Sequence, residues 1–519
     1  MHAHGCMDAH GCACKPPYWC TAALVTLQSC QSYIHAHIVW KDSESEVADA
    51  PRMQVTRKQR QTLVAWGSDM LKRAATIAVH LTTLFSGGAK CDPLCMFNDC
   101  AGSDTPYHAL CALGAPAKVI AISEKAAAPR RFLNASAHIQ QHGTIVYTDL
   151  LKRDHTDHRL MCRETIYTAG FPCKPFSGLN NGFQCDAARM DDANAKPLYG
   201  VGATIQARRP PLVILENVTR VMRCWDAIRP ILNPEDAYFV TVQHIDPKHL
   251  GVPAQRRRVF IIMVLRSFLP SNSNDSRLDK QASDLVQAMS MECKYTFDHL
   301  LYPAGHDAIK AYTRVIKVNA DAKLCGCRDC HGVRGLGAGA DLAKKPDRFV
   351  KCGWRHWHWD EMERMGVDPA EAKHVSERLP YVRGMIRPRP RHVAANNMVA
   401  YPTAKCMDVS QRLGRNAVTE SRFPCLTPNG TLFLPHRSSI ITPVEKMIIM
   451  GFDIGAMPIH VLSENQISSI AGNAMHTRAM ACALTTAFGI VDCKKLMAHV
   501  RTQAALCAAK SLKRKRMAT

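Results

Sequence analysis

The sequence predicts a doubly wound α/β domain with a mostly parallel sheet, joined to a smaller and irregular second domain. Short apolar runs alternate with helix-like segments from about residue 92 to residue 267. These runs are largely apolar, which is typical of strands covered on both faces. Beyond them lies an irregular stretch rich in Arg and His. Because strands that alternate with helices usually pair in parallel, the first segment is expected to form one sheet with helices on both sides.

The predicted elements follow in chain order. Strands are expected at 94–97, 118–122, 144–147, 166–168, 212–215, 238–242 and 259–264. Helices are expected within 59–84 and at 105–113, 126–137, 198–207 and 221–232. Gly114 is placed to end the second of these helices. Much later, Thr442, Pro443 and Glu445 form the pattern of a capping box with proline in the first turn, which predicts the start of another helix.

Composition indicates a folded, basic protein. The 519 residues include 66 Lys+Arg against 44 Asp+Glu, a formal net charge of +22, and 47% are hydrophobic. This composition argues against wholesale disorder. The positive charge favours a polyanionic partner, with simple solubility as the alternative. No apolar run of about 20 residues is present, so no transmembrane helix is expected. The first residues lack the pattern of a signal peptide, so secretion is not expected.

The 23 cysteines are better explained as thiols, metal ligands or catalytic groups than as a disulfide framework. Two groups have a composition that could bind a metal. One contains Cys6, Cys12, Cys14 and Cys20 among N-terminal histidines, and the other contains Cys325, Cys327, Cys330, His331 and Cys352. Neither spacing matches a well-defined zinc module, so the presence of a metal stays open.

Polar or reactive side chains follow four successive predicted strands. Glu124 follows the second strand and Asp149 the third. Cys173 lies in the loop after the fourth, and Glu216 follows the fifth. Ligands of a doubly wound sheet bind at the carboxyl ends of its strands, where a carboxylate such as Glu124 commonly binds ribose hydroxyls. Each residue alone could be a surface carboxylate or a buried thiol. Together they predict one cleft.

These residues resemble the motifs of the C5-cytosine DNA methyltransferases. Residues 170–177, Gly-Phe-Pro-Cys-Lys-Pro-Phe-Ser, resemble the nucleophile loop of that family, and 216–218 resemble its Glu-Asn-Val motif. Residues 251–258 resemble its Gln-x-Arg-x-Arg motif, and 442–452 and 466–474 resemble its last two motifs. The order along the chain is that of the family, and the resemblance covers roughly residues 92–492.

The resemblance implies a Rossmann-like methyltransferase domain that moves a methyl group from S-adenosyl-L-methionine to cytosine C5 in flipped-out bases of double-stranded DNA. Cytosine C5 is a poor nucleophile until a group adds to C6, and a thiolate such as Cys173 can add and leave again. Glu216 would hold or donate a proton at N3, and Arg258 would bind the O2 atom. The catalytic set also includes Arg256 from the same motif.

The expected cofactor site comprises Gly102, Glu124, Asp149 and Asn473. A second glycine loop, at Gly87, resembles the first family motif more closely. Gly87 lies 37 residues before Glu124 and Gly102 lies 22 residues before it. Since a strand-loop-helix-strand unit needs only about 20 to 30 residues, spacing favours Gly102.

The chain departs from the family pattern at three places. Lys174 and Ala254 stand where the family usually has Gln, and residues 103–105, Ser-Asp-Thr, replace a glycine-rich run. These departures bear on catalytic efficiency more than on identity.

The resemblance divides the chain into five segments. They are a poorly defined N-terminal extension (1–90), the catalytic domain (91–267), a target-recognition region (268–435), a C-terminal return of the catalytic domain (436–495) and a basic tail (496–519). A linker is expected at 271–276. Basic and aromatic residues suited to nucleic acid, including Trp354, Trp357, Trp359 and Arg383, Arg387, Arg389, Arg391, lie in the recognition region.

Two alternatives remain beside a DNA methyltransferase. One is an RNA cytosine-C5 methyltransferase with the same catalytic domain, and the other is a catalytically inactive DNA-binding relative. The run Lys513-Arg514-Lys515-Arg516 favours a nuclear location, although a solvated basic end is equally consistent with it. The sequence gives no indication of oligomeric state.

Overall fold

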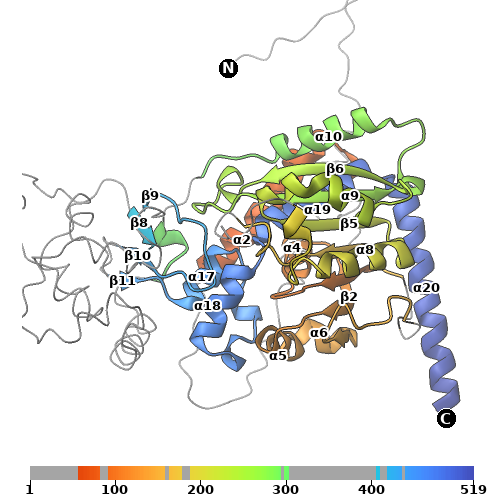
Figure 1. Cartoon of the computed structure of the whole chain (residues 1–519), viewed down its shortest axis with the longest axis horizontal. Coiled ribbons are helices and arrows are strands. Elements are labelled where there is room, and N and C mark those ends of the chain that lie inside the picture. Colours follow the sequence, from red (N-terminus) through yellow and green to blue (C-terminus); the bar gives the residue numbers. More distant parts are fainter. Residues whose placement is uncertain are drawn as a thin grey trace, which may run out of the picture.

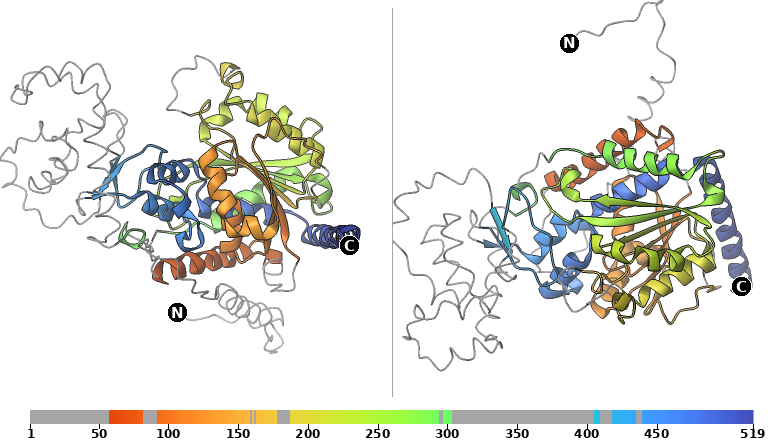
Figure 2. Two further views of the ribbon diagram at one scale, coloured as in Figure 1. Left: turned by 90° about the horizontal axis from the view of Figure 1, so that it is seen from below. Right: turned by 45° about the horizontal axis from the view of Figure 1, so that its top comes forward.

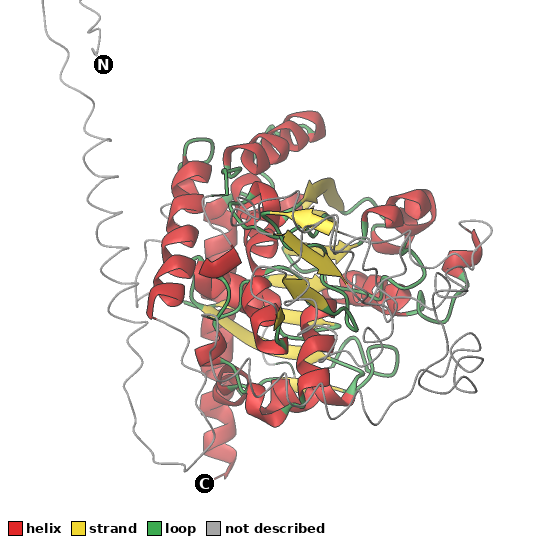
Figure 3. Cartoon of the chain, turned by 90° about the vertical axis from the view of Figure 1, so that its left-hand side faces the viewer, coloured by secondary structure: helices red, strands yellow, loops and turns green. Residues whose placement is uncertain are grey.

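A computed structural model describes residues 57–81, 92–157, 160, 163–177, 187–293, 297–302, 405–408, 418–434 and 439–518. Its main body is a seven-stranded sheet with helices on both faces (Figures 1 and 3). The strands are β1 (Leu94–Asp99), β2 (Ala117–Ser123), β3 (Ile145–Tyr147), β4 (Ile166–Ala169), β5 (Leu212–Asn217), β6 (Tyr238–Ile245) and β7 (Arg258–Leu265). Each coincides with one of the predicted runs, and β3 begins one residue later than predicted, at Ile145.

The order of strands in the sheet is β3-β2-β1-β4-β5-β7-β6. All neighbouring pairs from β3 to β5 are parallel, and only β7 runs antiparallel to both of its neighbours. The chain moves outward from β1 to β3, then crosses back to place β4 on the other side of β1. This reversal creates a switch point between β1 and β4, where doubly wound sheets bind ligands. The predicted fold class is therefore confirmed.

Helices cover the sheet. They include α4 (Thr105–Ala112), α5 (Ala127–Ala135), α6 (Ala137–His142), α7 (Ala187–Met190), α8 (Pro197–Arg208), α9 (Trp225–Leu232) and α10 (Asp275–Ala288), with short 3-10 turns η2 (Thr219–Cys224), η3 (Pro247–His249), η4 (Arg266–Phe268) and η5 (Phe297–His299).

Two predicted helices are divided in the structure. The segment expected at 126–137 breaks at Ser136, whose backbone is extended and whose hydroxyl donates to Phe132 O (2.9 Å), so that α5 ends and α6 begins. The segment expected at 221–232 begins as η2 and becomes α-helical only at Trp225. Apolar periodicity alone does not distinguish these cases from a continuous helix.

Residues 271–276, expected to be a linker, instead contain the start of α10. The Asn274 side chain accepts a hydrogen bond from Arg277 N (2.8 Å), which is the usual N-cap contact. Leu278, Ala282 and Leu285 are buried, and α10 packs against β6. The α/β body therefore continues beyond residue 268, because a polar run with Ser and Asn caps a helix as readily as it forms a linker.

Two further helices complete the body, and one of them comes from the segment expected to be an extension. Helix α2 (Arg57–Ala75) buries Trp66, Met70 and Ala74 in the same core cluster as α10. Every residue of α19 (Thr477–Ile490) is buried, and this helix packs against α2, α4, α10 and the strands β5 to β7. Segments from both ends of the described chain thus share one hydrophobic core.

A second unit is built around a small antiparallel sheet of order β11-β10-β8-β9. Its strands are β8 (Lys405–Asp408), β9 (Val418–Glu420), β10 (Leu432–Leu434) and β11 (Ser439–Ile440). Helices α17 (Pro443–Ile449) and α18 (Glu464–Asn473), with η10 (Ile454–Ala456) and η11 (Ile459–Val461), connect it to the main body. Its apolar core includes Phe132 of α5. Figures 1 and 2 show α17 and α18 between the two sheets.

The last helix, α20 (Cys493–Ala518), lies at the end of the molecule opposite α17 and α18 (Figures 1 and 2). Leu496 and Val500 are buried, and Gln503 accepts a hydrogen bond from Arg163 N (2.9 Å). Among the described residues, no helix combines the length and the apolar character needed to cross a membrane.

Candidate functional site

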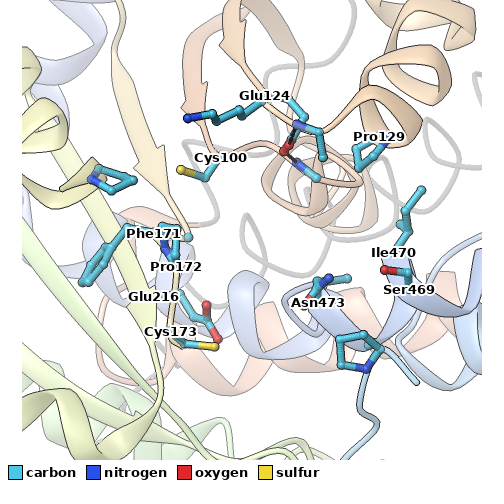
Figure 4. Close-up of a pocket in the computed structure, with 18 of the residues that line it drawn as sticks. Cys100, Glu124, Pro129, Phe171, Pro172, Cys173, Glu216, Ser469, Ile470 and Asn473 are labelled. Carbon is cyan, nitrogen blue, oxygen red and sulfur yellow. Dashed lines mark hydrogen bonds between the residues drawn. The ribbon is translucent and has the colours of Figure 1, made fainter. Parts of the chain in front are cut away.

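A cavity of about 920 Å³ opens at the switch point, along the carboxyl ends of the parallel strands. The loops after β1 to β4 and the end of β5 line one side of it, and α18 with residues 425–428 lines the other. All eight residues proposed from the sequence line this cavity: Gly102, Glu124, Asp149, Cys173, Glu216, Arg256, Arg258 and Asn473. Figure 4 shows several of them facing the same space.

The loop that carries Cys173 is anchored on both sides. Phe171 and Phe176 are buried and contact each other edge to face. Asn217 donates a hydrogen bond to Phe171 O (2.9 Å), and Arg189 donates one to Pro175 O (2.6 Å). The thiol thus projects from a loop whose two flanks are fixed, which is the preorganisation that a nucleophile needs.

Cys173 and Glu216 lie side by side at the cavity wall (Figure 4). Burial raises the pKa of the Cys173 thiol, and Glu216 adds to this effect, while Arg258 and Arg256 oppose it. Burial also raises the pKa of Glu216, again against the pull of both arginines. A carboxyl group whose pKa is raised retains a proton more readily, which suits a residue that must hold or donate one.

Arg258 reaches this site because β7 is antiparallel. Its first residue therefore lies at the same edge of the sheet as the last residues of the parallel strands. The Arg258 Nε atom is 3.1 Å from Glu216 Oε1, and both side chains are largely buried. The guanidinium of Arg258 thus lies beside the carboxylate of Glu216, and the family resemblance assigns both residues to the catalytic set.

Arg256 has several structural contacts at the cavity wall. Its guanidinium donates to Leu426 O (2.9 Å) and to Gly472 O (3.0 Å), and its main-chain N donates to Asp246 Oδ1 (3.0 Å). It is only 4% exposed. Arg256 therefore links the loop before β7 to α18 and to the 425–428 segment.

Further along the same side of the cavity, the loop after β1 contacts Glu124. Gly102 N donates to Glu124 Oε2 (2.9 Å), and Ala126 N donates to Glu124 Oε1 (2.8 Å). Asp149 accepts a hydrogen bond from Leu151 N (3.0 Å), which lowers the pKa of Asp149. Glu124 and Asp149 thus present carboxylate oxygens near the β2 and β3 ends of the cleft, where a ribose or a base amino group could bind.

Asp104 lies where the family usually has a glycine-rich run, and the structure explains how the loop accepts an aspartate there. Asp104 is fully buried and adopts the left-handed conformation (φ 56°, ψ 42°) that favours glycine. Its carboxylate accepts a hydrogen bond from Asn98 Nδ2 (2.5 Å), and Asp104 Oδ2 lies within hydrogen-bond distance of His138 Nε2 (2.9 Å). Tyr107 stacks on the His138 ring. These contacts offset the backbone strain of a non-glycine residue.

The C-terminal segment contacts the loop after β1 at the end of α18. Thr105 donates a hydrogen bond to Met475 O (3.4 Å), and Asn473 lines the cavity (Figure 4). A small recess between α4 and this segment is lined by Asn98, Ser103, Thr105 and Asn473 among others. A Cβ atom at Gly170 would lie 2.5 Å from Met475 Cε, so the glycine permits this close approach.

Sequence reasoning missed three groups near the site. Cys425 lines the cavity beside Arg258. Asp99, the last residue of β1, forms a buried ion pair with Arg153 and accepts a hydrogen bond from Tyr167 OH (2.5 Å). It immediately precedes the loop that contains Gly102. The Asp104–His138 pair is the third. None has a local sequence signal, since each pairs residues that are distant along the chain or lies in an irregular segment.

Some sequence predictions concern residues outside the described part of the chain. These are the two Cys/His groups, the Trp and Arg clusters of the recognition region, and Gly87. Within the described ranges, no group of three or more His, Cys, Asp or Glu side chains could hold a metal ion. The side chains of the basic run at 513–516 are likewise outside the description.

The fold and the cavity define a class of protein. A doubly wound sheet with a seventh, antiparallel strand carries a thiol, a carboxyl and a guanidinium beside a nucleotide-type cleft, an arrangement suited to covalent chemistry on a bound base. Comparison with known proteins agrees. The family described as C-5 cytosine-specific DNA methylase matches residues 135–321. The chain is thus similar to the C5-cytosine methyltransferases over the part that carries the loop after β4 and strands β5 to β7.

Individual relatives are distant. The DNA (cytosine-5-)-methyltransferase DMT5 of Cryptococcus neoformans var. grubii is 23% identical over 390 residues, which cover 69% of this chain and 15% of DMT5. The type II methyltransferase M.MspI of Moraxella sp is 26% identical over 132 residues, covering 24% of this chain and 29% of that enzyme. The chain thus spans less than a third of the length of either relative. The Entamoeba histolytica methyltransferase EhMeth has 12% identity and a TM-score of 0.42, covering 76% of this chain and 98% of that structure.

Proposed function

We propose that this protein transfers a methyl group from S-adenosyl-L-methionine to C5 of cytosine in double-stranded DNA. The observation that carries the proposal is the convergence of Cys173, Glu216 and Arg258 on the wall of one cavity whose other end holds Gly102 and Glu124. The net charge of +22 is consistent with a nucleic-acid substrate. The family supports a C5-cytosine methyltransferase, and the choice of DNA is part of the proposal.

The residues at one end of the cavity fit the proposed cofactor. Glu124 offers carboxylate oxygens for ribose hydroxyls, and Asp149 offers an acceptor for an adenine amino group. The N-terminus of α4, beside the recess that Asn473 lines, suits the methionine carboxylate. When bound, S-adenosyl-L-methionine supplies an electrophilic methyl group.

The residues at the other end of the cavity, Cys173, Glu216 and Arg258, would carry out the reaction. The Cys173 thiolate adds to C6 of a flipped-out cytosine, and the electron pair of the C5–C6 double bond moves toward C5 and the ring. Glu216 protonates N3, and Arg258 stabilises charge at O2. C5 then forms a bond to the methyl carbon as the methyl–sulfur bond breaks, and S-adenosyl-L-homocysteine leaves with that electron pair. Solvent water takes the C5 proton, the C–H electron pair restores the C5–C6 double bond and expels Cys173 as thiolate, and the N3 proton returns to Glu216.

The test is methyl transfer from labelled S-adenosyl-L-methionine to duplex DNA and to tRNA, measured side by side. We expect label in the DNA and none with the Cys173→Ala variant. Label only in tRNA would favour an RNA cytosine methyltransferase with the same chemistry. Binding of DNA without transfer to either substrate would favour an inactive DNA-binding relative. A nuclear location, favoured by the basic C-terminal run, is proposed with this function and is tested by imaging the tagged chain.

A further inference from the structure

Cys425 lies in the cavity between two arginines. It belongs to the irregular segment between β9 and β10, and neighbouring residues 426–428 line the same wall. Its sulfur is 3.7 Å from Arg256 Nη1 and 3.7 Å from Arg258 Nη2. The second contact involves the same guanidinium whose Nε atom lies 3.1 Å from Glu216 Oε1. One planar group thus connects the thiol to the carboxyl.

Positive charge exceeds negative charge around this guanidinium. The titratable and charged groups that face it are Arg256 from the loop before β7, Glu216 from β5, Cys173 from the loop after β4 and Cys425. His476, which precedes α19 and interacts with Arg256, is fully buried, and this burial lowers its pKa to about 3, so it is neutral. Among these described groups, Glu216 is the one carboxyl that acts on both guanidinium groups, so two positive charges share it unless a cysteine carries charge. Asp246 contacts the main-chain N of Arg256.

The imbalance grows during the proposed reaction. Glu216 must be protonated to serve the N3 atom, and a neutral Glu216 leaves Arg256 and Arg258 without a carboxylate partner. Removing one partner of a buried charged pair is unfavourable, so the two arginines oppose the effect by which burial raises the pKa of Glu216. A negative charge elsewhere on the two arginines would relieve the cost.

We propose that Cys425 is a positioning residue for the methyl transfer: its sulfur, as a thiolate, orients Arg258 toward Glu216 and balances the charge of Arg256 and Arg258. The inference rests on the proposed function, and it adds a second cysteine with a role distinct from that of Cys173. Cys425 acts through Arg258 and makes no bond to the base.

The electrostatics of the pocket are consistent with this role. Burial works against ionisation of Cys425, but Arg256 and Arg258 outweigh it and lower the pKa of the Cys425 thiol. Burial also works against the charge of Arg258, but Cys425 and then Glu216 raise the pKa of Arg258. By contrast, the pKa of Cys173 is raised. The two thiols of the cavity are thus shifted in opposite directions.

The first experiment measures methyl transfer as a function of pH for the full chain. Cys425→Ser keeps the size of the side chain and removes the negative charge. Ionised Glu216 then becomes more favourable, so the alkaline limb of the kcat profile should move to lower pH, and kcat near neutral pH should fall by roughly tenfold. The Kd for S-adenosyl-L-methionine should not change. Cys425→Asp retains a negative charge and should not show the downward shift.

Cys111→Ser is the matched control, because Cys111 is exposed on α4 and does not line the cavity. A Cys425→Ser variant with the kcat and pH profile of the wild type would overturn the inference. If Cys425→Asp fails to fold, as judged by its melting curve, the Ser variant alone decides. A purely structural role for Cys425 predicts a loss of stability with an unchanged pH profile.

The second experiment does not depend on turnover. The rate of iodoacetamide alkylation at Cys425, followed by mass spectrometry of its peptide, should rise at lower pH in the folded protein than in the denatured chain. Arg258→Gln should shift that rise back to higher pH. If Cys425 shows the same pH dependence folded and denatured, this inference fails even where methyl transfer is confirmed. If the shift is present but no nucleic acid is methylated, the proposed function fails instead.

Discussion

At the scale of single residues, backbone conformation explains the sequence of the loop after β1, the proposed cofactor loop, better than composition does. Gly102 and Asp104 both have φ 56°, in the left-handed region. A glycine adopts this conformation without cost, whereas an L-residue is strained by roughly 1 kcal/mol. Asp104 offsets the strain through contacts with Asn98 and His138. The loop therefore keeps the geometry of a glycine-rich turn with a different residue.

We expect Gly102→Val to abolish measurable binding of S-adenosyl-L-methionine. A Cβ atom at Gly102 has no close neighbour, the nearest being Cys100 O at 4.0 Å, so the variant is not blocked by a clash within the chain. The β-branched side chain is instead strained at φ 56° and fills the cleft that the cofactor must enter. Calorimetric titration measures the loss.

Gly87→Val is the comparison variant, and its effect on binding is expected to be mild. Gly87 lies outside the described residues, so this expectation still depends on spacing. A binding loss confined to Gly87→Val would contradict the assignment of the cofactor loop to Gly102.

Covalent trapping tests the role of Cys173. With cofactor present, DNA containing 5-fluorocytosine should form a stable adduct with the wild-type chain, because fluorine cannot be eliminated as a proton. Cys173→Ala should form none, while its melting temperature should change little, since the side chain faces the cavity. Denaturing electrophoresis detects the adduct. An undiminished yield in the Ala variant would assign the nucleophile elsewhere.

At the scale of elements, the N-terminus of α4 depends on a partner helix. The carboxylate of Asp104 precedes α4, and His138 comes from α6. Together with Tyr107, which stacks on His138 at 3.9 Å between ring centroids, they fix the start of α4 against β2 and α6. The loop proposed to bind the cofactor is therefore held by a buried polar contact.

We expect His138→Ala to destabilise the protein by about 3 kcal/mol, because it leaves the Asp104 carboxylate buried without one of its partners. It should also weaken cofactor binding through the loosened loop. Adding Asp104→Gly should recover part of the stability, since glycine accepts φ 56° and removes the unpaired charge. Chemical denaturation of the two single variants and the double variant forms the cycle. Strictly additive effects would show that the two residues do not interact.

Another element, β7, decides where Arg258 lies. The sequence predicts an apolar strand at 259–264 but not its direction. Because β7 inserts between β5 and β6 and runs antiparallel, Phe260 pairs with Glu216, and Arg258 projects near the end of β5. A parallel strand at this place would carry Arg258 to the opposite edge of the sheet.

At the scale of the whole molecule, the body closes only when the C-terminal segment returns. All 14 residues of α19 are buried, between the sheet on one side and helices α2, α4 and α10 around it. Burying a large apolar side chain contributes about 1.5–3 kcal/mol, and a domain is stable by about 5–15 kcal/mol in total. The stabilising free energy lost with a fully buried helix therefore exceeds the total free energy of unfolding of the domain.

A chain that ends at residue 440 should accordingly lose its cooperative unfolding transition and its cofactor binding. A chain that ends at residue 505 should keep both, since it retains α19 and the buried residues Leu496, Val500 and Gln503 of α20. Differential scanning calorimetry with and without S-adenosyl-L-methionine compares the two. Full cofactor affinity in the shorter chain would contradict the shared core.

The sequence by itself determined the strands of the main sheet and which reactive side chains lie at the carboxyl ends of those strands. Each predicted strand is a largely apolar run, and such runs between helical segments favour a buried strand. The residues that follow those runs, Glu124, Asp149, Cys173 and Glu216, therefore had to lie at one edge, and the structure brings them to one cavity. Local pattern was sufficient here because strand and loop are neighbours along the chain.

Only the tertiary structure decided which distant residues complete the site. Cys425 contacts Arg256 across 169 positions and Arg258 across 167, and Gly472 O accepts a hydrogen bond from Arg256 across 216 positions. The burial of α2 beside α19, the direction of β7 and the pairing of Asp104 with His138 are likewise products of packing. Such contacts depend on how the surfaces of separate helices and strands pack against each other. The periodicity of apolar residues within one segment does not predict that packing.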